Sequence, residues 1–248
     1  MRIKLLLSIF ALLTTVCAAT AESLGHARRA QALLGPDVWS QIIRVENNAR
    51  TRKYPHILHA LVFELAGVLW FYTDVDGTQS FSLHRNRLAA EKANFAPLLR
   101  DIEPGFERWT VVEATLGETT AELPNGAELP NGCFIESYAA LRVLVARGVA
   151  VAEPRLLSYY ANRASLRQGH TVLAYSAAGR VAVVDPLRPA AKLLFPASLS
   201  ADPKELARAV QGPEVMHAIV LPLPLPKGPA AREIFAANET SPSITSSL

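Results

Sequence analysis

Cys133, His170 and Asp185 have the residue types and local settings that acyl-transfer chemistry requires. Cys133 opens an apolar run with three- and four-residue spacing, which predicts an amphipathic helix. A thiol in the first turn of a helix lies beside unpaired backbone N–H groups and the positive end of the helix dipole. Because both favour the thiolate over the thiol, Cys133 is predicted to be a nucleophile.

His170 and Asp185 lie in two short runs of β-forming residues, 169–175 and 180–185, separated by Ser176-Ala177-Ala178-Gly179. This pattern predicts a β-hairpin. With the two alanines as the turn, His170 lies directly opposite Asp185 on the same face, with Cβ atoms roughly 4.5–5.5 Å apart. The carboxylate could then orient the imidazole. A nucleophile, a base and an orienting acid are the parts of an acyl-transfer site.

The order of these residues, with a cysteine opening a helix and the other two on neighbouring strands, resembles the bacterial transglutaminase-like cysteine peptidases of the papain-like group. The similar sequence segments are Asn131-Gly132-Cys133 and the run from Gly169 to Tyr175, which leads into Val183-Val184-Asp185-Pro186. The resemblance covers about residues 130–190. The resemblance implies an α+β fold with a papain-like core, in which an antiparallel sheet packs against the helix that begins at the catalytic cysteine. It also implies acyl transfer from an amide or peptide through a thioester intermediate.

An oxyanion hole is the remaining requirement of this chemistry. No glutamine stands just upstream of Cys133, which departs from the pattern of the family. Asn131 and Gln79 are the candidate side-chain donors, although Asn131 also suits the N-cap of the helix and Gln79 also suits a surface position. The backbone N–H of Cys133 is the safer donor, because it points out of the start of the helix.

The first 21 residues predict a secretory signal peptide, with a basic start, an apolar stretch over residues 5–16 and an Ala19-Thr20-Ala21 cleavage site before Glu22. The mature protein is therefore expected to be exported, periplasmic or secreted, with no membrane-spanning segment. Cleavage removes Cys17 and leaves Cys133 as a lone thiol, so no internal disulfide is predicted.

The composition argues against several other functions. The chain has 25 basic and 22 acidic residues, and loss of Arg2 and Lys4 with the signal leaves 23 basic ones, so the mature chain is nearly neutral. Without a basic stripe interleaved with aromatic residues, nucleic acid is not a predicted partner. His56 and His59 lack further ligands nearby, so neither a metal nor a cofactor is predicted. The resemblance and the predicted export, and not the composition, imply the expected partner, which is a peptide or protein amide such as a cell-wall peptide.

Residues 22–228 are predicted to form a single α+β domain, with the catalytic core in about residues 120–220 and a flexible tail over residues 229–248. The turn Asp74-Val75-Asp76-Gly77 predicts a hairpin, while residues 38–45 and 57–65 suit either a helix or a strand. Residues 121–132 repeat Ala-Glu-Leu-Pro-Asn-Gly twice and predict a loop beside the site. Helices are predicted over residues 23–34, 88–102, 154–163 and 202–210, and strands over 109–113 and 215–220.

Two other classes of function stay open at this point. The chain could be a catalytically inactive papain-like module that binds a partner in the periplasm, which the missing glutamine upstream of Cys133 favours. It could also be a redox-active single thiol, although the mature chain holds no resolving cysteine. The reactivity of Cys133 in the folded protein distinguishes these alternatives from an acyl-transfer enzyme.

Overall fold

The computed structural model describes residues 22–48, 53–80, 95–112, 129–163, 166–188 and 192–226. Within these ranges the protein is α+β, which confirms the predicted fold class. It contains two five-stranded antiparallel sheets, where the prediction described one sheet. It divides into two compact units, Met1–Leu34 with Val38–Glu136, and Gly35–Asp37 with Ser137–Leu248. The predicted signal peptide, the predicted tail and residues 121–128 of the repeat lie outside the described residues.

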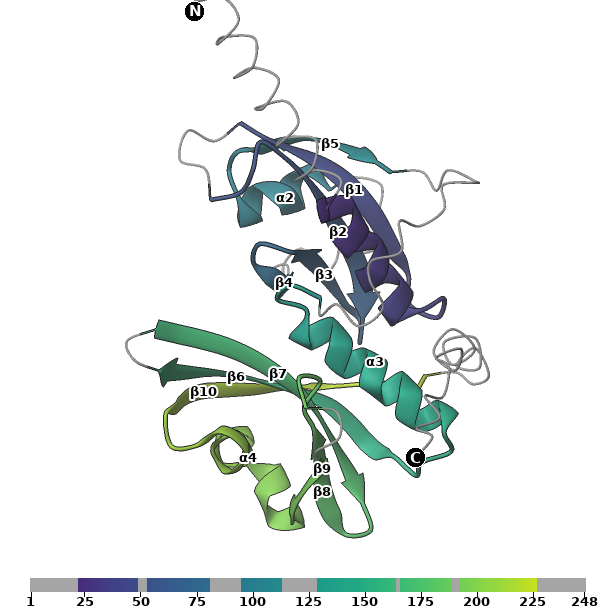
Figure 1. The fold of residues 1–248 in the computed structure, drawn as a ribbon, viewed down its shortest axis with the longest axis vertical. Helices are drawn as coiled ribbons and strands as arrows, with labels where there is room; N and C mark the ends of the chain where they lie inside the picture. Colours follow the sequence, from purple (N-terminus) through teal and green to yellow (C-terminus); the bar gives the residue numbers. More distant parts are fainter. Residues whose placement is uncertain are drawn as a thin grey trace, which may run out of the picture. The chain divides into compact units, whose positions relative to one another are not determined.

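The N-terminal unit is built on the sheet with strand order β4-β3-β2-β1-β5 (Figure 1). Its strands are β1 (Ser40–Asn47), β2 (Ile57–Leu65), β3 (Val68–Thr73), β4 (Gly77–Ser80) and β5 (Phe106–Val111). The predicted hairpin at residues 74–77 is confirmed, since β3 and β4 pair across it. The segments left open between helix and strand form β1 and β2, whose apolar side chains are buried on both faces of the sheet.

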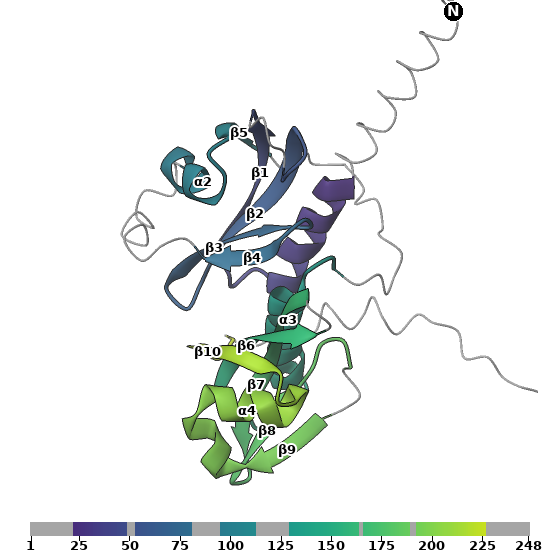
Figure 2. The same ribbon diagram turned by 90° about the vertical axis from the view of Figure 1, so that its left-hand side faces the viewer.

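Helices cover both faces of this sheet (Figure 2). α2 (Ala96–Ile102), with Pro97 in its first turn, packs over a core that includes Ile43, Leu58, Val62, Phe71 and Leu99. The helix over residues 22–34 lies on the other face, where the Ser23 hydroxyl contacts His59 Nδ1 at 3.1 Å. Phe134, in the first turn of α3 (Cys133–Ala146), packs on the same face against Trp70, with ring centroids 4.5 Å apart. The N-terminal unit therefore holds the start of α3 by an aromatic contact.

The C-terminal unit is built on the sheet with strand order β10-β6-β7-β8-β9. Its strands are β6 (Ala152–Arg163), β7 (Leu166–Ala177), β8 (Arg180–Val184), β9 (Lys192–Pro196) and β10 (Val215–Pro222), with the short 3-10 helix η2 (Ala197–Ala201) after β9. α4 (Pro203–Gln211) covers one face, over a core that includes Leu157, Tyr159, Val172, Val183 and Leu206. The part of α3 from Ser137 onward lies toward the opposite face (Figures 1 and 2).

The helix predicted over residues 154–163 is wrong, because this segment is strand β6. β6 pairs with β10 on one side and β7 on the other, and Leu157, Tyr159 and Ala161 are buried at every second position beneath α4. Pairing on both sides outweighs the local helical pattern. The helix predicted after Asp202 is confirmed as α4, where the Asp202 carboxylate accepts the N–H groups of Lys204 and Glu205.

Asp76 anchors the β3–β4 turn in the N-terminal unit. Its Oδ2 accepts hydrogen bonds from Lys53 Nζ at 2.6 Å, from Gln79 Nε2 at 3.1 Å and from the Tyr54 hydroxyl. Partial burial disfavours the charged carboxylate, but the hydrogen bonds from Lys53 and Tyr54 outweigh it and lower the pKa of Asp76 below its ordinary value of 3.8. The carboxylate therefore stabilises the folded state, because folding favours its charged form.

Replacing Asp76 by Asn should destabilise the protein by about 1–3 kcal/mol at pH 7, since charge-assisted hydrogen bonds are lost. A depressed folded-state pKa adds stability that is present above the unfolded value of 3.8 and is lost as the pH falls through the folded value. The difference in the free energy of unfolding between wild type and Asp76→Asn, measured by urea denaturation, should therefore be smaller at pH 3 than at pH 7. A gap of equal size at both pH values would contradict this assignment.

Candidate active site

His170 and Asp185 lie together in the C-terminal unit. The distance between His170 Nε2 and Asp185 Oδ1 is 3.0 Å, and the two side chains are 16% and 22% exposed. The same Asp185 oxygen accepts the backbone N–H of Leu187 at 3.0 Å, which fixes the carboxylate. The predicted contact between the imidazole and the carboxylate is thus confirmed. Because it uses Nε2, a proton transfer by this histidine to a third group would use Nδ1.

The register of the hairpin differs from the predicted one. Ala177 pairs with Arg180, so the turn consists of Ala178 and Gly179, whose φ angles are 48° and 71°. Two left-handed residues in a two-residue turn favour glycine at the second position, a signal that the predicted turn of two alanines did not use. In this register, Asp185, which directly follows β8, lies two residues before the position opposite His170. It stays on the same face of the sheet, so the imidazole reaches the carboxylate along the diagonal.

The His170–Asp185 pair lies on the face of the sheet that carries α4. His170 is opposite Tyr159 of β6, and the two rings meet edge to face with centroids 5.8 Å apart. Tyr159 belongs to the core beneath α4, and its hydroxyl donates to Gln211 Oε1 at 3.3 Å. The orientation of the imidazole is therefore set by a buried aromatic ring as well as by Asp185.

Cys133 is the first residue of α3 and is half-buried, with a free thiol. The N–H of Glu136 donates to the carbonyl of Gly132 at 2.9 Å, which closes the first turn and leaves the N–H of Cys133 at the open end of the helix. The predicted helix start at this residue is confirmed. Cys133 belongs to the N-terminal unit and the His–Asp pair to the C-terminal unit, so the convergence of the three side chains stays a prediction.

Asn131 is not the N-cap of α3, which corrects the prediction. Its φ angle is 52°, and its side-chain Nδ2 donates to the carbonyl oxygens of Asp74 at 2.8 Å and Val75 at 3.0 Å. Gly132 occupies the cap position instead. The prediction failed because the β3–β4 turn presents two carbonyls to this amide, a tertiary contact that the local sequence does not indicate.

The amide of Gln79 also has partners within the N-terminal unit. Its Nε2 donates to Asp76 Oδ2 at 3.1 Å and to the Tyr54 hydroxyl at 3.4 Å. Both candidate oxyanion side chains, Asn131 and Gln79, thus direct their donors to other groups. The backbone N–H of Cys133, at the open end of α3, stays the predicted oxyanion donor.

His26 and Asp74 form a second His–Asp pair that the sequence analysis missed. Their Nδ1 and Oδ2 atoms are 2.9 Å apart, and the side chains are 13% and 20% exposed. The two residues are far apart in sequence, so no motif joins them. His56 Nδ1 contacts the Asn47 carbonyl, and His59 Nδ1 contacts the Ser23 hydroxyl. Among the described residues, no cluster of three possible metal ligands occurs.

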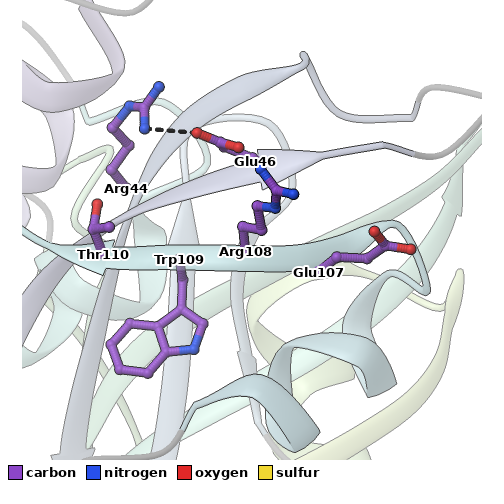
Figure 3. Close-up of a pocket in the computed structure, with 6 residues that line it drawn as sticks. All are labelled: Arg44, Glu46, Glu107, Arg108, Trp109 and Thr110. Carbon is purple, nitrogen blue, oxygen red and sulfur yellow. Dashed lines mark hydrogen bonds and ion pairs between the residues drawn. The ribbon is translucent and has the colours of Figure 1, made fainter.

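A groove on the N-terminal unit is lined by residues of β1 and β5 (Figure 3). Arg44 Nη1 donates to Glu46 Oε1 at 2.9 Å, and Arg108 points to the same side. Trp109 points to the opposite side and packs against Phe95. Charges of both signs alternate here and none of the candidate catalytic residues lines the groove, which indicates a solvated sheet face.

No protein-family model, curated protein or solved structure matches the chain. The resemblance to transglutaminase-like cysteine peptidases therefore rests on the residues of this chain alone. Across the ranges that the structure describes, no helix is both long and apolar enough to span a membrane.

Proposed function

We propose that the protein is a cysteine-dependent acyl-transfer enzyme on a papain-like core, with Cys133 as nucleophile, His170 as base and Asp185 as the acid that orients the base. The observation that carries this proposal is the 3.0 Å contact between His170 Nε2 and Asp185 Oδ1. A carboxylate in that place holds the imidazole in one tautomer and stabilises the imidazolium that forms during reaction.

The reaction follows from these roles. The Cys133 thiol gives its proton to His170, and the sulfur attacks the carbonyl carbon of an amide or ester. The backbone N–H of Cys133 stabilises the tetrahedral oxyanion. His170 returns the proton to the leaving amine or alcohol, and a thioester remains on Cys133. Water then releases an acid, or an amine forms a new amide. Peptide or protein amides, including cell-wall peptides, are the proposed substrates.

A contact within the C-terminal unit further supports the proposal. The hydroxyl of Ser137 in α3 donates to the carbonyl of Thr171 at 2.9 Å, and both residues are buried. Thr171 follows His170 in β7, and Ser137 lies about one helical turn after Cys133. This bond ties the nucleophile's helix to the strand that carries the base.

The proposal is tested by treating the mature protein with an activated ester, p-nitrophenyl acetate, and measuring the mass of the intact protein. The expected product is a single acyl group on Cys133 that is lost with time. Cys133→Ser is the matched control, because it keeps the side-chain shape but should form no thioester.

We also propose that the protein is exported, with cleavage after Ala21. The basic start, the apolar stretch and the Ala-Thr-Ala site support this proposal. Expression of the full chain in a bacterium with a Sec pathway should yield a periplasmic or secreted form whose first residue is Glu22. A mature form with another first residue would contradict the cleavage site, and a protein found only in the cytoplasm would contradict export.

The alternative function is a catalytically inactive papain-like module that binds a partner. Two observations favour it. Asn131 and Gln79 direct their amide donors to other groups. In addition, the His170–Asp185 pair lies on the α4 face of its sheet, whereas α3 from Ser137 onward lies toward the other face. A folded protein whose Cys133 forms no acyl adduct would support this alternative.

A further inference from the structure

The loop that precedes Cys133, residues 129–132, is seated on the β3–β4 hairpin of its own unit. Asn131 Nδ2 donates to the carbonyls of Asp74 and Val75 at 2.8 and 3.0 Å. The Tyr72 hydroxyl donates to the carbonyl of Pro130 at 2.9 Å. Side chains of both the loop and the hairpin therefore contribute bonds to main-chain atoms across this contact.

The ionisation of Tyr72 fits its role as a donor. Burial, followed by the negative charges of Asp74 and Glu136, raises the pKa of Tyr72 far above its ordinary value of 10.0. The phenol is therefore protonated at neutral pH and can donate this hydrogen bond. Glu136 contributes to the same loop, because its Oε1 accepts the backbone N–H of Leu129 at 2.8 Å.

The backbone conformation of the loop also suits this contact with the β3–β4 hairpin. Asn131 has a φ angle of 52°, in the left-handed region that asparagine tolerates better than most residues. Gly77 approaches the loop so closely that a Cβ atom on it would lie 2.5 Å from the Asn131 carbonyl oxygen. Only glycine allows the hairpin to come this near, so the contact is built into both partners.

The hairpin turn that receives Asn131 is itself held from two sides. His26, on the helix over residues 22–34, pairs with the Asp74 carboxylate at 2.9 Å. The Asp76 carboxylate accepts hydrogen bonds from the Lys53 ammonium and the Tyr54 hydroxyl. Because this turn is fixed to the rest of the N-terminal unit, the hydrogen bonds of Asn131 to the turn also fix the loop before Cys133 to that unit.

We propose that Asn131 is a positioning residue, which fixes the place of Cys133 by tethering the preceding loop to the β3–β4 turn. This inference rests on the proposed function and assigns to the N-terminal unit the task of holding the nucleophile. Asn131 acts through main-chain carbonyls and does not contact the reacting atoms. Its importance follows from the sensitivity of such reactions to geometry, since a misplacement of about 1 Å can cost roughly 100-fold in rate.

The test uses two variants of the mature protein. Asn131→Gly keeps the left-handed backbone but removes both donors, and Asn131→Asp keeps the side-chain shape but replaces the donors by an oxygen that the carbonyls repel. Both should lower the rate of alkylation of Cys133 by iodoacetamide at pH 7 by about tenfold or more. Both should also speed hydrogen exchange of the amides of residues 129–136. The matched control is Ala66→Gly, at φ 53° in another turn of the same unit, which should change neither.

Wild-type rates of alkylation and of hydrogen exchange in both Asn131 variants would overturn the positioning role. Slow alkylation in the Ala66→Gly control would also overturn it, because glycine at any left-handed position of the unit would then have the same effect. If wild-type Cys133 reacts no faster than free cysteine, the proposed enzyme function fails separately. In that case, hydrogen exchange alone tests whether Asn131 tethers the loop to the β3–β4 turn. Faster exchange in the variants supports the tether, and unchanged exchange overturns it.

Discussion

Replacing His170 by Ala should reduce acylation of Cys133 by p-nitrophenyl acetate by about 1000-fold or more at pH 7, because the base that accepts the thiol proton is lost. Alkylation by iodoacetamide should slow by at least about tenfold, since the cationic partner of the thiolate is also removed. Each tenfold loss corresponds to about 1.4 kcal/mol. Stopped-flow absorbance measures the first rate, and mass spectrometry of quenched samples measures the second.

The matched control for this substitution is His217→Ala, which removes an exposed histidine from β10 of the same unit. It should leave both rates unchanged. Circular dichroism and the unfolding midpoint check that His170→Ala stays folded, because this side chain also packs against Tyr159. A folded His170→Ala protein that is labelled as fast as wild type would end the enzyme proposal and support the binding-module alternative.

Replacing Asp185 by Asn should lower turnover of an activated ester or amide by about 1000- to 10,000-fold, while most of the alkylation of Cys133 is retained. The amide has nearly the shape of the carboxylate, but it no longer favours the imidazole tautomer that accepts the thiol proton. Its oxygen can still accept the N–H of Leu187, so the turn after β8 should persist. The measurement is kcat against pH for both proteins.

Asp202→Asn provides the control for this exchange of acid for amide. Asp202 caps α4, and asparagine caps helices about as well as aspartate, so stability and turnover should both stay near wild type. Turnover of Asp185→Asn within about threefold of wild type would contradict the orienting role. The His–Asp contact would then be a structural pair, as His26–Asp74 is in the N-terminal unit.

The parts of the fold that local sequence determines could be predicted. The hairpin around Gly77, the capped helix after Asp202 and the helix start at Cys133 each depend on residues close together in the chain. Strand β6 was missed because its state depends on pairing with β7, which follows it directly, and with β10, which lies more than fifty residues further along the chain. The pattern of its apolar residues alone does not distinguish a buried strand from a helix.

The candidate site likewise has features that local sequence predicts and features that depend on residues distant in sequence. The contact between His170 and Asp185 could be predicted because one hairpin joins the two residues, although the turn was placed one residue too early. The partners of Asn131 could not be predicted, because they are main-chain carbonyls more than fifty residues away. Such contacts form only when the whole unit packs.

The acyl-enzyme itself is the most direct test of the central proposal. The mature protein is mixed with p-nitrophenyl acetate, quenched in acid at intervals and analysed by intact mass and peptide mapping. The proposal predicts one acetyl group on the peptide that contains Cys133, formed within seconds and released over longer times, and absent in Cys133→Ser. No adduct in the folded wild-type protein, or acetylation only of lysines and to the same extent in Cys133→Ser, would contradict it.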